Sequence, residues 1–224
     1  MKKHITAVIP VRKGSQRVKN KNTKKFSNST LLEIKIKQLK RLSNLDKIVV
    51  SSDCENMLSI ARDLGVHTHV REEYYASSEA TNSEFFKNLA SSIPGQNIMY
   101  SPVTCPLISL ETYEECIDLF QSQDVNNVVT VAPVKHHMWL DGKPINYDIR
   151  KSPNSQDLPD IYQITYGVCL LSKQDMIEYS NVVTRTPTFK VLNEIESIDI
   201  DTEFDFMVAE MVYNKLVGAQ VVKK

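Results

Sequence analysis

The sequence predicts an α/β fold, in which a mainly parallel sheet is covered by helices on both faces. Short apolar runs of strand length alternate along the chain with longer segments of helical periodicity. Such alternation implies crossover connections, which join parallel strands and place helices on the two faces of the sheet. The chain has 224 residues, 42% of them hydrophobic and 24% charged, which suits one globular domain with its own core. We therefore expect residues 1–224 to form a single domain.

Each predicted strand is a short apolar run between polar or turn-forming residues. The runs are Ile5–Ile9, Lys47–Val50, Val66–Val70, Asn97–Tyr100, Asn127–Val131 and Ile164–Leu171. Ligands of open α/β sheets bind beyond the carboxyl ends of the strands. This rule directs attention to the loops after Ile9, Val50 and Tyr100.

The predicted helices are bounded by recognisable capping residues. Asp53 is a suitable N-cap for the second helix, and Gly65 follows its end. Ser109 precedes the fourth helix, while Thr202 and Asp205 have the spacing of a capping box at the start of the last. The predicted helices are Thr30–Leu42, Cys54–Leu64, Glu84–Ser92, Leu110–Phe120 and Thr202–Leu216.

Charge and cysteine usage exclude several classes of protein. The 27 basic and 27 acidic residues cancel, whereas a general nucleic-acid or membrane-surface binder needs a basic excess. The four cysteines are scattered without CxxC spacing, which argues against a zinc site or a disulfide framework. Neither a signal peptide nor a membrane span can be recognised. We expect a cytoplasmic protein with no nucleic-acid or membrane partner.

Residues 133–160 interrupt the alternation of strands and helices. The segment is rich in Pro, Asn, Asp and Lys, yet it also carries Trp139, Leu140 and Tyr147. This mixture is too polar for a core and too apolar for a plain linker. We expect a small insertion that packs on a second copy of the chain to form a homodimer, with a disordered loop as the alternative.

A basic loop follows the first predicted strand. It places five cations, Arg12, Lys13, Arg17, Lys19 and Lys21, within ten residues. Like charges this close repel one another unless an anion neutralises them. Gly14 lets the backbone approach a ligand, and Ser15 adds a hydroxyl donor. The loop matches neither GxGxxG nor GxxxxGK[ST]. A triphosphate is the expected occupant, and a solvated basic loop is the alternative.

Two aspartates near the end of the chain form a candidate metal site. Asp199 and Asp201 alternate with Ile198 and Ile200, so both carboxylates project to one side of an extended segment. Paired carboxylates are costly unless they bind a cation or share a proton. Mg²⁺ takes one or two carboxylates together with substrate phosphate oxygens, and Mn²⁺ is expected to substitute. The alternative is that Asp201 only caps the following helix.

The basic loop resembles the signature of the acylneuraminate cytidylyltransferases, which include the CMP-sialic and other CMP-nonulosonic acid synthetases. The matching residues are Ile9-Pro10-Val11-Arg12-Lys13-Gly14-Ser15-Gln16-Arg17 and Lys19-Asn20-Lys21-Asn22. The resemblance implies a Rossmann-like nucleotidyltransferase fold whose loop wraps the phosphates of CTP. It also implies phosphate contacts from Arg12, Ser15 and Lys21, and a contact from Asn22 to the cytidine.

The resemblance continues along most of the chain. Ser197-Ile198-Asp199-Ile200-Asp201 resembles the segment whose aspartates hold magnesium in that family. By the same resemblance Arg71 helps to hold the cytosine, and the loop that includes Asn82 and Ser83 lies beside it, unless these two residues only form a turn and a helix cap. Thr104 matches the substrate-binding loop after Tyr100. The family's glutamine for the sugar acid has no counterpart, and Tyr166-Gly167 replaces its Asn-Gly turn.

These features together predict a nucleotidyl transfer. The anomeric hydroxyl of a small acidic sugar, a nonulosonic acid, would attack the α-phosphorus of CTP, with Arg12 and Lys21 as the catalytic cations. An enzyme for another acid such as Kdo, or for a non-sugar phosphate, is the first alternative. A non-catalytic nucleotide-binding assembly protein is the second. The clustered carboxylates favour the enzyme, because a binder has no need for them.

Overall fold

The computed structural model describes residues 2–222, and it describes the side chains as far as residue 217. A seven-stranded sheet forms the centre, in the order β11-β7-β10-β6-β1-β4-β5. Its strands are β1 (Ile5–Pro10), β4 (Lys47–Ser52), β5 (His67–Val70), β6 (Asn97–Tyr100), β7 (Asn127–Val134), β10 (Ile161–Ser172) and β11 (Thr188–Val191). Within this sheet every ladder is parallel except the two formed by β10, which is antiparallel to β6 and to β7. The mainly parallel sheet is therefore confirmed.

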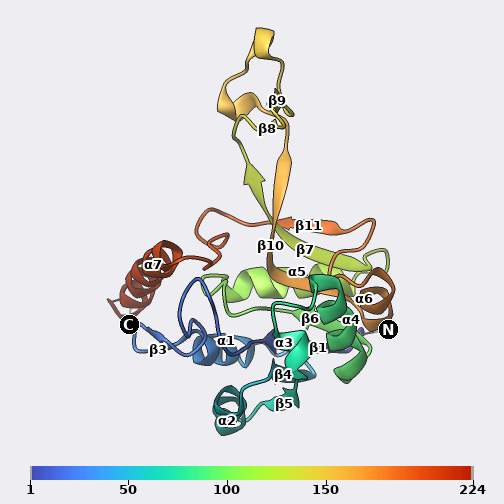
Figure 1. Ribbon diagram of the computed structural model, residues 1–224, viewed down its shortest axis with the longest axis vertical. Helices are drawn as coiled ribbons and strands as arrows, with labels where there is room; N and C mark the ends of the chain where they lie inside the picture. Colours follow the sequence, from blue (N-terminus) through green and yellow to red (C-terminus); the bar gives the residue numbers. More distant parts are fainter. Residues whose placement is uncertain (1, 223–224) are drawn as a thin grey trace.

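Helices cover both faces of the sheet, as expected (Figure 1). Ala7 and Ile9 of β1 belong to one buried cluster, and Val8 between them belongs to a second cluster on the opposite face, as the alternation of side chains along a strand requires. The first cluster includes side chains from α1 (Leu31–Leu39), α2 (Glu55–Asp63), α5 (Leu110–Gln121) and α7 (Glu203–Val222). The second is covered by α4 (Asn82–Ser92) and α6 (Lys173–Tyr179).

Three helix starts confirm or correct the predicted caps. Ser109 caps α5, and its Oγ accepts the backbone N–H of Thr112 at 3.1 Å. Thr202 and Asp205 form the predicted capping box. The prediction for Asp53 was wrong, because Cys54 occupies the N-cap of α2 and makes no side-chain cap bond.

The loops that follow β1, β4 and β6 meet at one edge of the sheet. β1 is parallel to both neighbours, so the three carboxyl ends point the same way. Short elements complete the body: β2 (Lys25–Phe26), β3 (Ser29–Thr30) and α3 (Glu73–Ala76). Within the described residues, no helix combines the length and the apolar character that a membrane span needs.

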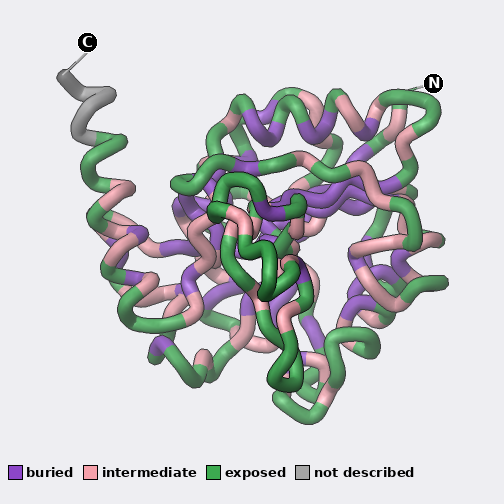
Figure 2. Tube along the Cα trace, turned by 90° about the horizontal axis from the view of Figure 1, so that it is seen from above, coloured by how far each residue is buried: buried purple, intermediate pink, exposed green. Residues whose placement is uncertain are grey.

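Residues 133–160 form an arm that projects from the body (Figure 1). The ends of β7 and β10 remain paired as far as Val134 and Ile161. Beyond them lie the paired strands β8 (Trp139–Leu140) and β9 (Lys143–Pro144) and the 3-10 turns η1 (Ile149–Lys151) and η2 (Ser155–Asp157). The arm is thus folded, unlike the disordered loop considered above, and its surface is exposed in this single chain (Figure 2).

Candidate active site

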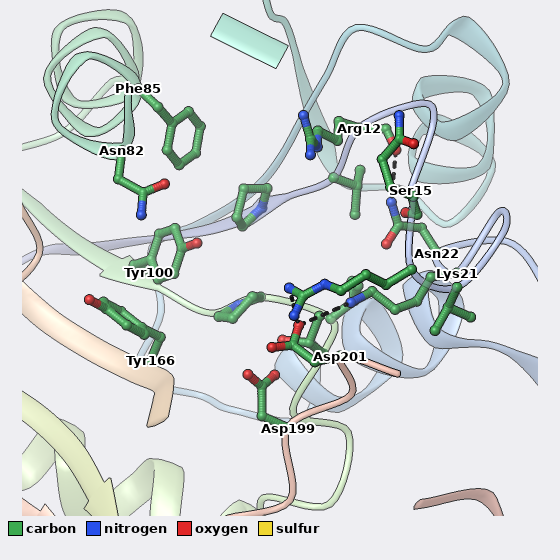
Figure 3. A pocket seen from close by; sticks show the side chains of 18 of the residues that line it. Arg12, Ser15, Lys21, Asn22, Asn82, Phe85, Tyr100, Tyr166, Asp199 and Asp201 are labelled. Atoms are coloured by element: carbon green, nitrogen blue, oxygen red, sulfur yellow. Dashed lines mark hydrogen bonds and ion pairs between the residues drawn. The ribbon is translucent and has the colours of Figure 1, made fainter. Parts of the chain in front are cut away.

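A cavity of about 460 Å³ opens at the carboxyl ends of β1 and β6, and Arg71, which follows β5, also lines it. Its walls come from the basic loop after β1, from Arg71, from the start of α4, from the segment after β6 and from Tyr166 of β10. The segment that holds Asp199 and Asp201 forms another side (Figure 3). The location is the one expected for a ligand of an open α/β sheet.

Hydrogen bonds within the protein fix the basic loop to the body. They form without a bound phosphate. The Arg12 guanidinium donates to the Ala76 carbonyl at 2.8 Å, and the Asn22 side chain donates to the Arg12 carbonyl at 3.0 Å. The Lys13 N–H donates to the Asp53 carboxylate at 3.0 Å. Asp53 therefore holds the loop instead of capping a helix. Gly14 has a φ of +77°, a conformation that L side chains rarely adopt.

The Lys21 side chain extends from the basic loop toward the acidic pair. Its ammonium donates to the Ile200 carbonyl and lies 3.9 Å from an Asp201 carboxylate oxygen. Burial lowers the pKa of Lys21, while Asp201 and Asp199 act in the opposite direction. The lysine thus presents its charge in a partly desolvated position, where a cation stabilises a phosphate more strongly than it does in bulk water.

Asp199 and Asp201 both project into the cavity, as their alternation with isoleucines predicted (Figure 3). Ile200 is fully buried, and its N–H donates to the Thr104 carbonyl at 2.9 Å, which anchors the segment. Burial raises the pKa of Asp199, and the neighbouring Asp201 adds to the shift. Asp201 accepts a hydrogen bond from the Arg17 guanidinium at 2.8 Å. Because Thr202 caps α7, a capping role does not account for Asp201.

Arg71 forms a buried corner of the cavity. Its guanidinium donates to the Val11 carbonyl and lies 5.1 Å from the centre of the Phe85 ring. Burial lowers the pKa of Arg71 to about 10. Its Nε is buried without a partner among the described residues. A buried donor of this kind is costly unless a ligand or water completes it, so the corner is suited to a polar flat group.

Most of the predicted site residues meet in this cavity. It brings together Arg12, Ser15, Lys21, Asn22, Arg71, Asn82, Thr104, Asp199 and Asp201. Gly14 shapes the loop without lining the cavity. Ser83 does not line it either, because α4 starts at Asn82, which points inward, and the next residue of a helix faces another direction.

The cavity also contains residues that the sequence reading had not assigned to the site. Among them are five aromatic residues: Tyr75, Phe85, Phe86, Tyr100 and Tyr166. Four of them lie within predicted helical or strand segments, where an aromatic residue ordinarily indicates core: Phe85, Phe86, Tyr100 and Tyr166. Tyr75 lies between predicted elements. For Tyr166 the sequence offered one signal, its place at the Asn-Gly turn of the resembled family. Its inward position could not be predicted, because it depends on a local bend in β10.

Comparisons with known proteins agree with this picture. The cytidylyltransferase family model matches residues 6–144. The N-acylneuraminate cytidylyltransferase of Streptococcus agalactiae serotype V is 27% identical over 89% of this chain, which spans about half (51%) of that protein. The CMP-N,N'-diacetyllegionaminic acid synthase of Legionella pneumophila is 26% identical over 92% of this chain and 94% of its own.

A solved structure supports the same fold. The CMP:2-keto-3-deoxy-manno-octonic acid synthetase complexed with CTP superposes with a TM-score of 0.67, at 9% identity, over 95% of this chain and 99% of that one. The expected Rossmann-like nucleotidyltransferase fold is therefore confirmed, as is the expected class of enzyme. The family model spans more than half of the sequence, including the basic loop and Arg71, and the chain belongs to the cytidylyltransferase family.

Proposed function

We propose that this protein transfers the cytidylyl group of CTP to the anomeric hydroxyl of a nonulosonic acid and releases pyrophosphate. The observation that carries the proposal is the placement of Asp199 and Asp201 beside Lys21 in the cavity that the basic loop borders. Cations for a triphosphate and carboxylates for a metal ion thus face one space. The named activities of the Streptococcus and Legionella relatives support the choice of acceptor.

The cations of the loop would hold the triphosphate and stabilise the charge that develops on it. Arg12 and Ser15 would bind the pyrophosphate that leaves, and Lys21 would neutralise the α-phosphate in the transition state. Positioning and charge neutralisation dominate phosphoryl chemistry of this kind. The preformed bonds of Arg12 and Asn22 reduce the reorganisation that binding of CTP would require.

We further propose that Asp199 and Asp201 hold Mg²⁺, for which Mn²⁺ would substitute. The donor set fits, because Mg²⁺ prefers one or two carboxylates and completes its shell with phosphate oxygens and water. The partly buried, like-charged pair would also be relieved of its repulsion. A bound ion of this type would polarise phosphate oxygens and lower the pKa of the attacking hydroxyl. Arg17 pairs with Asp201 in this structure. This ion pair would have to break or rearrange when Asp201 binds the metal ion.

A pyrophosphate-release assay tests the function directly. CTP would be supplied with N-acylneuraminic acid, N,N'-diacetyllegionaminic acid and Kdo in parallel. Release with an acylated nonulosonic acid is expected. Release with Kdo alone would establish the alternative acceptor, and binding of CTP without release from any acid would establish the non-catalytic alternative.

The arm formed by residues 133–160 is our candidate for a homodimer contact. Trp139 is 52% exposed and Leu140 62% exposed, and Ile145 and Ile149 add to the exposed apolar surface on the same segment. Apolar side chains amid polar ones are typical of a symmetric interface. Sedimentation should give a dimer at micromolar concentration, and a monomer would refute the contact.

A cytoplasmic location is part of the proposal, as is the absence of nucleic-acid or membrane partners. Balanced charge supports the absence of such partners. The four cysteines, which all occur as free thiols, support a reducing compartment. A CMP-sugar made there would serve surface polysaccharide synthesis. Fractionation of cells that produce the protein would test the location.

A further inference from the structure

Tyr166 has an unusual backbone conformation beside the cavity. Its φ is +56°, and the register of β10 against β7 shifts between Ile164 and Cys169. A bulky residue with positive φ is strained, and such strain persists only where the surroundings impose it, often at functional sites. The Tyr166 side chain is 37% exposed and lines the cavity.

Contacts on both sides of Tyr166 fix the bend that β10 makes at this residue. The Thr165 hydroxyl donates to the Thr130 carbonyl at 3.0 Å, and the Thr130 hydroxyl accepts the N–H of Val168 at 3.0 Å. Gly167 is packed so closely that an added Cβ would clash with the Ile108 side chain. These contacts fix the residues on either side of Tyr166, so its ring is directed into the cavity by the rest of the fold.

A buried chain of hydrogen bonds supports the same bend from below. The Ser101 hydroxyl donates to the Gly167 carbonyl at 3.3 Å and lies 2.7 Å from the Tyr113 hydroxyl. The Tyr113 hydroxyl lies 2.5 Å from Lys35 Nζ. Lys35 Nζ also donates to the Cys105 carbonyl at 2.9 Å. The segment that follows β6 and the bend of β10 are therefore joined by one buried network.

The position of the ring indicates which substrate it meets. Tyr166 and Tyr100 both line the cavity, and in Figure 3 both lie on the side of Asp199 away from Lys21 and Ser15. Under the proposed function, the pyrophosphate leaves toward the cations of the loop. In-line attack requires the acceptor to approach from the opposite side of the α-phosphorus, which is the side where the two tyrosines stand.

We propose that Tyr166 determines acceptor specificity, by packing with Tyr100 against an acylamino or other apolar substituent of the sugar acid. The inference rests on the proposed function and extends it to a residue outside the predicted site. Aromatic rings offer an apolar face, and each hydroxyl adds one hydrogen-bonding group. An acceptor that carries only hydroxyl groups would therefore gain less binding free energy from the two rings than an acylated acceptor would.

The test compares three variants in steady-state kinetics. Tyr166→Gly removes the ring and suits the positive φ, so it should melt no lower than the wild type. It should reduce kcat/KM for the preferred acylated acid about tenfold, the scale of an apolar contact in a pocket. The KM for CTP should stay within about twofold, on the same basis. Tyr166→Phe should keep most of the activity. Tyr162→Ala is the matched control, since Tyr162 is also 37% exposed on β10 but packs on Phe189 outside the cavity.

The outcomes separate this inference from the proposed function. A wild type that releases pyrophosphate with no acid would overturn both. An active wild type together with a Tyr166→Gly variant of unchanged acceptor kinetics would overturn the role of Tyr166 alone. Equal losses toward CTP and acceptor would also overturn it, because they would show a general structural role. If Tyr166→Gly fails to fold, Tyr166→Asn provides the same comparison, since Asn tolerates the left-handed region.

Discussion

The ammonium of Lys35 lies 2.5 Å from the hydroxyl of Tyr113, and both side chains are fully buried beneath the cavity. Burial lowers the pKa of Lys35 to about 8, whereas a lysine in the unfolded chain titrates near 10.5. Between these two values the unfolded state carries a proton that the folded state lacks. Raising the pH through this window therefore makes the contribution of Lys35 more favourable to the folded state, relative to a chain with an uncharged residue at position 35.

The first prediction is a rise in stability with pH that depends on Lys35. The free energy of unfolding should gain about 3 kcal/mol from this group between pH 8 and pH 10.5. The Lys35→Met variant should lack that gain, since methionine fills a similar volume without a charge. Denaturant melts of both proteins across the window provide the measurement. Parallel curves for the two proteins would show that Lys35 keeps an ordinary pKa.

The second prediction concerns the two cations assigned to the transition state. Lys21→Ala and Arg12→Ala should each reduce kcat/KM more than tenfold while leaving the fold intact, because each removes a charge-assisted phosphate contact of about 2–3 kcal/mol. Lys19→Ala is the control, since Lys19 belongs to the same loop but is exposed and outside the cavity. Near-normal turnover by either variant would show that the replaced residue makes no important contact with the phosphates in the transition state.

The third prediction separates metal binding from helix capping. Asp199→Asn and Asp201→Asn should lose turnover, or need far more Mg²⁺ to reach it, with melting temperatures close to that of the wild type. Thr202→Ala should do the opposite, because its hydroxyl caps α7. It should lower stability by about 1 kcal/mol and retain its rate. Normal rates at low Mg²⁺ from both aspartate variants would leave the proposed metal site without support.

The fourth prediction is selectivity for CTP over UTP, ATP and GTP. The buried corner at Arg71 has a donor without a partner among the described residues, and a base that cannot complete it leaves that polar group unsatisfied. Competition assays that contain all four nucleotides measure the ratio of kcat/KM values. Equal rates with CTP and UTP would contradict base recognition at this corner.

Much of the site could be predicted because its residues follow local rules. The isoleucines around Asp199 and Asp201 indicate which way the carboxylates face, and the cations of the loop repel unless they share an anion. Both features depend on residues a few positions apart. A single sequence is therefore sufficient to place them.

Other features depend on contacts between distant parts of the chain. Asp53 has the sequence position of an N-cap, yet its carboxylate binds the N–H of Lys13 from another loop. The apolar run of β10 does not reveal that the strand is antiparallel to its neighbours, since direction depends on the connection before it. The bend at Tyr166 is imposed by Thr130 and Ser101, and no local pattern records it.

The arm and the cavity share one continuous element. β10 begins at Ile161, at the base of the arm, and reaches Tyr166 five residues later, a span of about 17 Å at the usual rise of a strand. A partner subunit bound to the arm would therefore contact the same strand that positions Tyr166 against the acceptor. Assembly and acceptor binding would then be linked in both directions, because a coupling free energy between two sites is reciprocal. The saturation curve for the acceptor would shift with protein concentration, while that for CTP would not.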